Sequence, residues 1–155
     1  MKDLGKRTKA REFAFKFIYQ YQLPELKNSP SDNSAELLEK KLVDFSSSYS
    51  EEDKEHPDNI LSSDSLAFAK SLISETLTNW SLLEEKVMEK TKGWKIENMD
   101  KIDLAILMIC ACELKHIDST PPSVVINEGV NLAKKFGAGN SFSFINGILD
   151  ALSKD

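Results

Sequence analysis

Nine consecutive apolar residues, from Leu104 to Cys112, form the longest apolar run in the chain. A membrane-spanning helix needs about 20 such residues, so this run predicts a buried helix rather than a membrane anchor. A helix that is apolar on nearly all sides must be surrounded by other helices. The run therefore predicts the central helix of an all-α fold, beginning at Asp100.

Six further segments carry helical signals. An apolar residue at every third or fourth position predicts an amphipathic helix. This spacing runs from Ala10 to Tyr21, ahead of Pro24, and again from Leu38 to Tyr49, after Ser34 as a possible cap. The other four helices are expected from Ser63, Asp64 or Ser65 to Trp80, from Ser81 to Gly93, from Pro121 or Pro122 to Gly137, and from Asn140 or Ser141 to Leu152. Because no segment alternates with a strand period, the sequence predicts an all-α fold of about seven helices.

Length and local composition set the expected domain organisation. A chain of 155 residues with 41% hydrophobic content can bury one substantial core, so a single domain spanning 1–155 is expected. Residues 46–63 lose the helical period, contain Pro57 and carry several acidic side chains, which predicts a mobile acidic loop. Ser81 and Glu84 have the spacing of a capping box. Gly147, inside the last helix, predicts close approach of another helix.

Charge is distributed unevenly along the chain. Residues 1–16 contain six basic and two acidic residues, a net charge of +4, so the remainder carries −9 of the total of −5. A basic end on an acidic protein is typical of binding to a polyanion. The start of the chain lacks the apolar stretch of a secretory signal, so a cytoplasmic protein is expected.

The first helix places cations beside aromatic rings. Arg11, Phe15 and Tyr19 follow one another at a spacing of four residues, beside the predicted core arc of the helix. Cations suit phosphates, and aromatic or guanidinium planes suit the unstacked bases of single-stranded RNA. The alternative is that Phe15 and Tyr19 widen the buried stripe while the cations form a solvated face. The helix alone does not decide between the two.

Catalytic and metal-binding patterns are absent from the sequence. The six glycines are isolated, so no phosphate loop, nucleophile elbow or dinucleotide fingerprint occurs. Cys110 and Cys112 lack the spacing of a redox or zinc motif and are expected to be buried packing residues. His56 and His116 have no ligands at metal spacing. Neither enzymatic activity nor a cofactor is expected.

Two groups of residues near the ends of the chain resemble a known family. The segment Val125–Gly137, VINEGVNLAKKFG, is followed by FINGILD at Phe144–Asp150. At the other end, RTKAREFA at Arg7–Ala14 precedes IYQ at Ile18–Gln20. These motifs, together with Trp94–Leu107, resemble the transcription antitermination factor NusB family. Only about residues 24–63 lack a recognisable counterpart.

The resemblance implies two small helical bundles packed together and a role in antitermination of ribosomal RNA transcription. Members of the family bind the single-stranded boxA element of nascent RNA together with NusE, a protein of the small ribosomal subunit, within the antitermination complex of RNA polymerase. Neither catalysis nor a cofactor is implied. Carried over by position, the RNA-binding residues would be Lys2, Lys6, Arg7, Lys9, Arg11, Tyr19, Asn140 and Phe144. This would place the last helix beside the first.

The same resemblance implies a partner contact and some departures. Asp103 matches a position that contacts NusE, although Asp100 and Asp103 can also simply favour the helix N-terminus. Thr8 and Ser143 stand where the family often has arginine and lysine, and Asn140 where it often has aspartate. Asn127 and Asn146 lie on otherwise apolar helices and are expected to form buried hydrogen bonds rather than to bind RNA.

Two other functions remain open. The NusB-like RNA-binding domain also occurs in ribosomal RNA cytosine methyltransferases, but those enzymes continue into a Rossmann-like catalytic domain, which is not expected in a chain ending at Asp155. A dimeric helical adaptor that never touches RNA would instead bury the first helix in a homodimer. Binding through phosphates predicts a steep dependence on salt, whereas a dimer interface does not.

Overall fold

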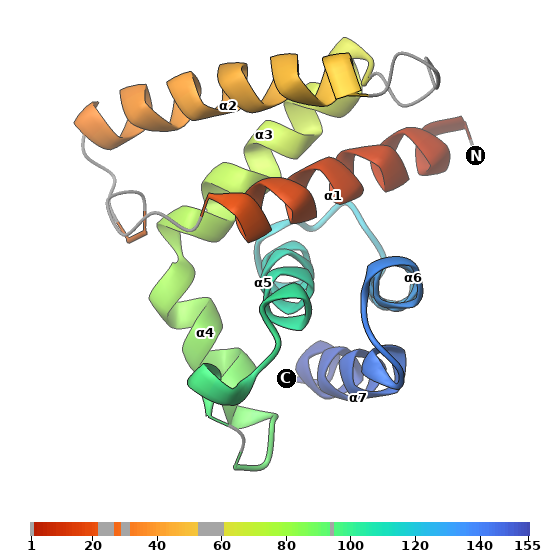
Figure 1. The fold of residues 1–155 in the computed structure, drawn as a ribbon. Coiled ribbons are helices and arrows are strands. Elements are labelled where there is room, and N and C mark those ends of the chain that lie inside the picture. The colour runs from red at the N-terminus through yellow and green to blue at the C-terminus, as the bar shows by residue number, and fades with distance from the viewer. Residues whose placement is uncertain (1, 22–26, 29–31, 53–60, 94) are drawn as a thin grey trace. The chain divides into compact units, whose positions relative to one another are not determined.

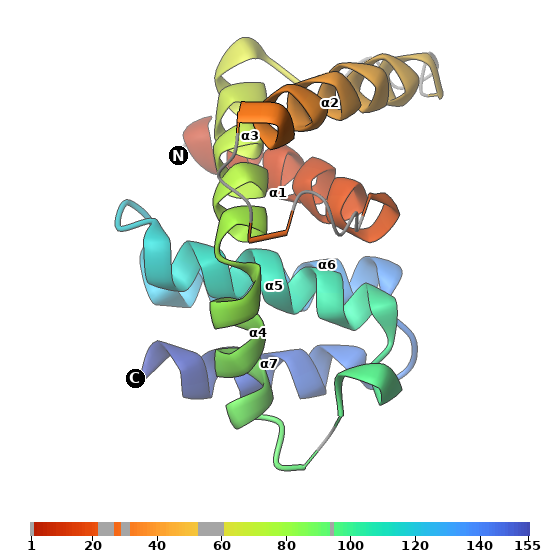
Figure 2. The same ribbon diagram turned by 90° about the vertical axis from the view of Figure 1, so that its left-hand side faces the viewer.

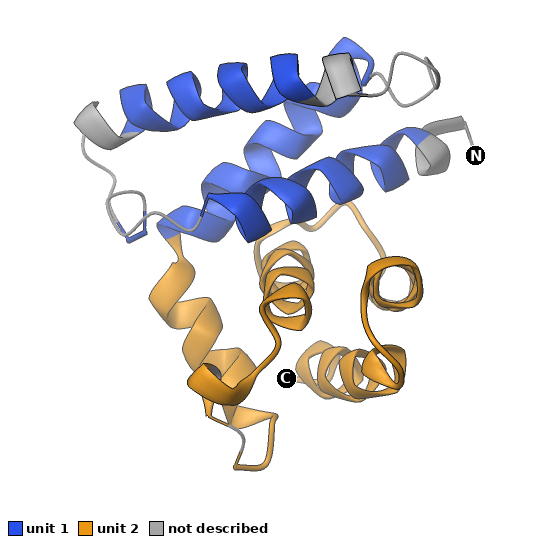
Figure 3. Cartoon of the chain, viewed as in Figure 1, with its two compact units in different colours: residues 1–78 blue, residues 79–155 orange. Residues whose placement is uncertain are grey.

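The computed structural model describes residues 2–21, 27–28, 32–52, 61–93 and 95–155 (Figure 1). All regular structure in these ranges is helical, which confirms the all-α class and the expected number of about seven helices. The α-helices are α1 (Lys2–Gln20), α2 (Asp32–Glu52), α3 (Ser63–Thr78), α4 (Trp80–Glu89), α5 (Lys101–His116), α6 (Pro122–Phe136) and α7 (Ser141–Ser153). A short 3-10 helix, η2 (Ile96–Asn98), precedes α5. The chain forms two compact units, residues 1–78 and residues 79–155, which we call unit 1 and unit 2 (Figure 3).

Unit 1 is held together by the apolar face of α1. This helix packs along α3, whose Ala69, Leu72, Ile73 and Leu77 are buried. An aromatic cluster joins α1 to α2, because the ring of Phe45 lies 5.0 Å from that of Phe13 and 5.5 Å from that of Phe17, centroid to centroid. Edge-to-face pairs at these distances are favourable beyond their burial. Within unit 1, the apolar face predicted for the first helix therefore packs against both α2 and α3.

Two boundaries in unit 1 differ from the predictions. Helix α2 continues to Glu52, so residues 46–52 are helical and the predicted start of the acidic loop at Ser46 is wrong. Residues 53–60 of that predicted loop lie outside the described residues. The cap of α3 is Ser62, one position before the predicted candidates, since its Oγ accepts a hydrogen bond from the backbone N–H of Ser65 at 3.2 Å. Such a bond satisfies an N–H group that the first turn leaves open.

Unit 2 is built around α5, as the apolar run predicted. Helix α5 contacts α4, α6 and α7, and α4 crosses both α5 and α7 (Figure 2). Every residue from Asp103 to Glu113 is buried. The helix begins where predicted, because Asp100 is its N-cap and accepts a hydrogen bond from the backbone N–H of Ile102 at 2.8 Å. Cys110 and Cys112 are free and buried, as expected.

Close helix packing in unit 2 occurs at Gly129, not at Gly147. A Cβ atom on Gly129 of α6 would lie 2.7 Å from Cδ1 of Leu149 on α7 and 3.0 Å from Sγ of Cys110 on α5. A Cβ atom on Gly147 would meet nothing within 4 Å. The prediction for Gly147 is therefore wrong, because this glycine lies on the exposed side of α7. Helix α6 begins at Pro122 and ends before Gly137, as predicted.

The start of α4 also differs from its prediction. The helix begins at Trp80, its N-cap is Asn79, and the predicted capping box of Ser81 and Glu84 is wrong. The Glu84 carboxylate instead accepts a hydrogen bond from the indole Nε1–H of buried Trp80 at 2.8 Å. The helix ends at Glu89, and Gly93 lies in the turn that follows, with φ of +98°.

Candidate nucleic-acid interface

The basic end of α1 lies against an aromatic ring of α3. The guanidinium carbon of Arg7 is 4.7 Å from the ring centroid of Phe68, within the range of a cation–π interaction. Lys6 is exposed, and Arg7 and Lys9 are half-buried. Lys6, Arg7 and Phe68 line a cleft of about 230 Å³ together with Asp64 and Ser65 at the start of α3. Of the predicted phosphate contacts, Lys6, Arg7 and Lys9 therefore have surface available to a ligand. The side chain of Lys2 lies outside the described residues.

Arg11 occupies a different environment from the other cations of α1. Its side chain is only 1% exposed, and its guanidinium carbon is 5.5 Å from the centroid of the same Phe68 ring. Burial of a charged guanidinium is rare unless other groups compensate it. The sequence placed Arg11 on the helix face intended for RNA, whereas its burial leaves little surface for a phosphate.

The aromatic residues of the same helix column are separated by burial. Phe15 is 3% exposed, which confirms the alternative that this ring widens the buried stripe. Tyr19 is 48% exposed, although its ring is 6.4 Å from that of Phe15. An exposed aromatic ring can stack on an unpaired base. Tyr19 is therefore the member of the predicted column that is available to a ligand.

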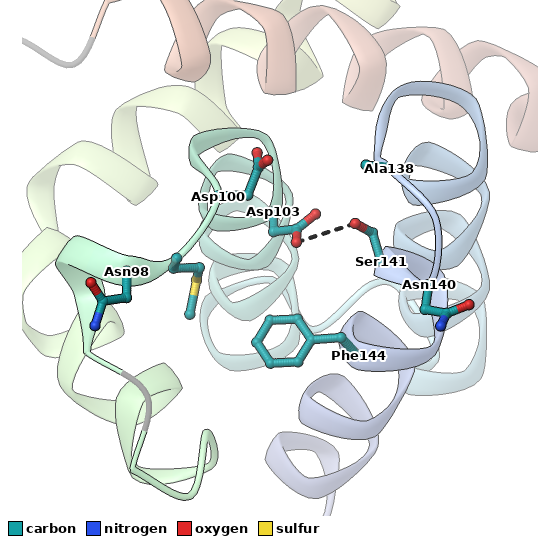
Figure 4. A pocket seen from close by; sticks show the side chains of 8 residues that line it. Asn98, Asp100, Asp103, Ala138, Asn140, Ser141 and Phe144 are labelled. Carbon is teal, nitrogen blue, oxygen red and sulfur yellow. Dashed lines mark hydrogen bonds between the residues drawn. The ribbon is translucent and has the colours of Figure 1, made fainter.

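The predicted residues of unit 2 meet at a cavity between the starts of α5 and α7. The cavity has a volume of about 350 Å³ and is lined by Asn98, Met99, Asp100, Asp103, Ala138, Asn140, Ser141 and Phe144 (Figure 4). Asn140 is exposed and Phe144 is half-buried. Three of the predicted binding residues, Asp103, Asn140 and Phe144, are thus brought together by the packing of α7 on α5.

Asp103 is a buried carboxylate with one unused acceptor. Its side chain is 8% exposed, and Oδ2 accepts a hydrogen bond from the hydroxyl of Ser141 at 3.2 Å. In the described part of the chain, Oδ1 is buried and accepts no hydrogen bond. Burial raises the pKa of Asp103 above the ordinary aspartate value of 3.8, the Ser141 hydrogen bond lowers it, and the charge of Asp100 raises it. A hydrogen-bond donor inserted into the cavity would relieve the cost of burying this oxygen.

The start of α7 is an open polar surface. Asn140 is the N-cap, as predicted, but its side chain makes no capping hydrogen bond. Asn146 of α7 and Asn127 of α6 are exposed, so the prediction that they form buried hydrogen bonds is wrong. Their helices turn these amides to solvent because other positions form the buried faces. These are Val125, Gly129, Leu132 and Ala133 in α6, and Ile145, Ile148, Leu149 and Leu152 in α7.

Sequence reasoning missed two aromatic residues that lie beside cations. Phe68 is one, and the signal available for it was its position just off the predicted inner face of α3. Phe142 is the other, with the Nζ atom of Lys134 5.4 Å from its ring centroid. Phe68 contacts Arg7 of α1 within unit 1, and Phe142 contacts Lys134 of α6 within unit 2.

The described residues contain neither a metal-binding cluster nor a membrane-spanning helix. Among the residues that the structure describes, no group of three histidine, cysteine or acidic side chains is arranged to hold a metal ion. No helix in this part of the chain is both long and apolar enough to cross a membrane. His116 is exposed at the end of α5, and His56 lies outside the described residues.

Comparison with known proteins identifies the family. The sequence model of the NusB family matches residues 8–154. The transcription antitermination protein NusB of Geotalea daltonii is 34% identical over 150 residues, which cover 97% of this chain and 95% of that protein. The protein of the same name from Oleidesulfovibrio alaskensis is 36% identical over 149 residues, which cover 96% of this chain and 87% of that protein.

Solved structures agree with this result. The solution structure of NusB from Aquifex aeolicus has a TM-score of 0.68 at 26% identity, covering 96% of this chain and 88% of that chain. The fold is also shared with NusB of T. maritima, with a TM-score of 0.72 at 22% identity, covering 96% of this chain and 91% of that chain. The family match across residues 8–154 and the relatives above 30% identity lead to one conclusion, which is that the chain belongs to the NusB family.

Proposed function

We propose that this protein binds the single-stranded boxA element of nascent RNA together with NusE, and so acts in antitermination of ribosomal RNA transcription by RNA polymerase. Its relatives carry the name of transcription antitermination protein, which agrees with a non-catalytic role. A structure with the same fold, described as NusB and NusE in complex with double-stranded RNA, has a TM-score of 0.70 at 22% identity over 96% of each chain. Such a role places the protein in the bacterial cytoplasm.

The observation that carries the proposal is the exposed surface of α1. Lys6, Arg7 and Lys9 offer cations at one end of this helix, and the ring of Tyr19 is exposed at the other. Helix α1 rises about 1.5 Å per residue, so Lys9 and Tyr19 are roughly 15 Å apart along its axis. This span suits several nucleotides of an extended strand, with phosphates on the cations and a base on the ring.

The roles proposed for the predicted residues follow their surroundings. Lys6, Arg7 and Lys9 would pair with phosphates, with Lys2 as a further cation. Tyr19 would stack on one base and Phe144 on another, with the amide of Asn140 beside it. Because Arg11 is buried against Phe68, we assign it the role of supporting the ring on which Arg7 rests, in place of a direct phosphate contact.

NusE would contact unit 2 at the cavity that contains Asp103. The carboxylate is too deeply buried for contact with a flat surface, since only 8% of the residue is exposed. A donor side chain of NusE inserted into the cavity could reach its unused Oδ1. Charge-assisted hydrogen bonds of this kind are stronger than those between neutral groups.

Fluorescence anisotropy with labelled boxA RNA, with and without purified NusE, tests the proposal. Binding should be tighter with NusE, stronger for boxA than for a scrambled RNA, and steeply dependent on salt. Equal binding of the scrambled RNA at physiological salt would reject the proposal. Sedimentation of the protein with and without RNA tests the alternative of a dimeric adaptor. A homodimer that dissociates when RNA is added agrees with an RNA-binding role, whereas a homodimer that is unchanged by RNA does not.

A further inference from the structure

Phe142 exposes an aromatic ring at the start of α7. It is 38% exposed. The large apolar side chains that are exposed in the described residues include one other aromatic ring, that of Tyr19. Phe142 lies at the edge of the buried stripe of α7, which is formed by Ile145 and residues one and two turns beyond it. The unit therefore leaves a large part of this ring in solvent although its helix is otherwise well buried on that side.

Lys134 brings a cation to this ring. It belongs to the last turn of α6, and its Nζ atom is 5.4 Å from the centroid of Phe142. Lys134 is itself exposed, so its ammonium group remains accessible to a ligand. Packing of α6 against α7 thus fixes a cation and an exposed ring side by side within unit 2.

The charge around this pair is unusual for the chain. Residues 131–149 contain Lys134 and Lys135 and no acidic residue, although the whole chain has 25 acidic residues and a net charge of −5. Asp103 is the carboxylate bonded to this region through Ser141, and it is buried. Within residues 131–149 a polyanion would therefore meet two lysines and no carboxylate, although the exposed side chain of Asp100 lines the adjoining cavity.

The pair also adjoins residues already assigned to RNA. Consecutive residues of a helix are about 100° apart, so Phe142 and Phe144 flank Ser143 on the first turn of α7. Ser143, Asn146 and Gly147 are exposed and small or polar, and a Cβ atom on Gly147 would meet nothing within 4 Å. The surface between the two rings is consequently open to a strand that crosses the start of α7.

We propose that Lys134 and Phe142 form a further contact with single-stranded RNA, in which Lys134 binds a phosphate and Phe142 stacks on an adjacent unpaired base. The assignment rests on the proposed function, because it requires RNA as the ligand. It extends the interface from the cavity side of α7, where Phe144 lies, to the side that faces α6. An aromatic ring beside a cation serves both parts of a nucleotide without reading its sequence.

The variants Phe142→Ala and Lys134→Ala test this contact in the complex of the full chain with NusE and boxA RNA. Loss of a base stack should weaken RNA binding by about five-fold or more without changing its salt dependence. Loss of one phosphate contact should weaken binding and reduce the slope of log K against log salt by about 0.7, the value for single strands. Lys134→Arg should restore the slope, because it keeps the charge.

Matched controls come from the same unit. Leu82→Ala removes an exposed apolar side chain from α4, and Lys154→Ala removes an exposed cation at the end of α7, so both should leave RNA binding unchanged. Circular dichroism should show that all variants are folded. NusE binding in the absence of RNA should equal that of the wild type, and its loss would overturn the assignment in favour of a protein contact.

The outcomes separate this inference from the proposed function. If the wild type binds boxA RNA and both variants bind with the same affinity and salt slope, the contact is overturned while the function stands. A change in only one variant also overturns the paired contact as stated. If the wild type with NusE does not prefer boxA RNA, the proposed function fails and this contact fails with it.

Discussion

Replacing glycine by alanine should stabilise unit 2 at Gly147 and should leave it less stable at Gly129 than at Gly147. Both glycines lie inside helices, where alanine is favoured by about 1 kcal/mol. At Gly129, however, the new methyl group would lie 2.7 Å from Leu149 Cδ1 and 3.0 Å from Cys110 Sγ, whereas carbon atoms normally rest about 3.5–4.0 Å apart. Leu149 and Cys110 are both buried, so neither can move into free space.

The size of the effect follows from these contacts. Overpacking of a filled core costs roughly 1–3 kcal/mol. Because the gain in helix propensity is common to both sites, the difference in free energy of unfolding between Gly147→Ala and Gly129→Ala equals this overpacking cost, about 1–3 kcal/mol. Gly147→Ala should exceed the wild type in stability by up to about 1 kcal/mol, since its methyl group meets no neighbour.

Urea unfolding followed by tryptophan fluorescence measures this difference in the correct unit. The two tryptophans, Trp80 and Trp94, both belong to residues 79–155. The urea midpoint should be higher for Gly147→Ala than for the wild type, and lower for Gly129→Ala than for Gly147→Ala. The slope of the unfolding free energy against urea concentration should be the same for all three proteins. A Gly129→Ala variant as stable as Gly147→Ala would refute the close packing of α6 on α5 and α7.

Three further substitutions test single interactions. Asp103→Asn should remove a pH dependence of stability, because the raised pKa of Asp103 makes its burial destabilising as the pH rises from the ordinary value of 3.8 through the pKa in the folded protein. The variant should therefore become increasingly more stable than the wild type over this window and then keep a constant advantage. Urea midpoints measured from acid to neutral pH would show this, and a constant difference at all pH values would exclude it. Arg11→Ala should lower the thermal stability of unit 1 by circular dichroism more than Lys9→Ala does, because it empties a buried site against Phe68, and equal melting of the two variants would contradict this role. Tyr19→Ala should weaken RNA binding in anisotropy while leaving the salt slope unchanged, and a changed slope would mean that the ring is not a stacking surface.

The parts of the fold that the sequence predicted well are those with strong local signals. The apolar run around Ile106 required a surrounded helix, and Asp100 marked its start through a capping hydrogen bond. Pro122 and Gly137 marked the ends of α6 in the same local way. These signals act within a few residues, so they do not depend on what the rest of the chain does.

The errors arose where neighbours from other helices decide the outcome. A glycine inside a helix indicates close packing only if another helix lies on its side, and the sequence does not tell Gly129 from Gly147 in this respect. Similarly, the position of Arg11 on its helix predicts a side chain accessible to phosphate, but the ring of Phe68 on α3 lies against it and the side chain is buried. The boundary of α2 was missed because serines and acidic residues after Phe45 favour loops only weakly.

The candidate site was predicted in part. The residues Asp103, Asn140 and Phe144 were named separately and meet at one cavity. Phe68 and Phe142 were missed because each becomes a candidate only through a cation on another helix. The guanidinium carbon of Arg7 lies 4.7 Å from the ring centroid of Phe68, and Nζ of Lys134 lies 5.4 Å from that of Phe142. The prediction that the last helix lies beside the first stays a prediction.

The most direct test of the central claim is the affinity of the protein for boxA RNA relative to a scrambled RNA, measured with NusE at physiological salt. Cations alone would bind both RNAs equally, because phosphates carry no sequence information. Stacking on Tyr19 and Phe144 adds affinity for either RNA. A preference for boxA RNA, which is the expected result, therefore requires polar groups that bond to base edges, such as the amide of Asn140, and Asn140→Ala should reduce it. Equal affinity for the two RNAs would contradict the account.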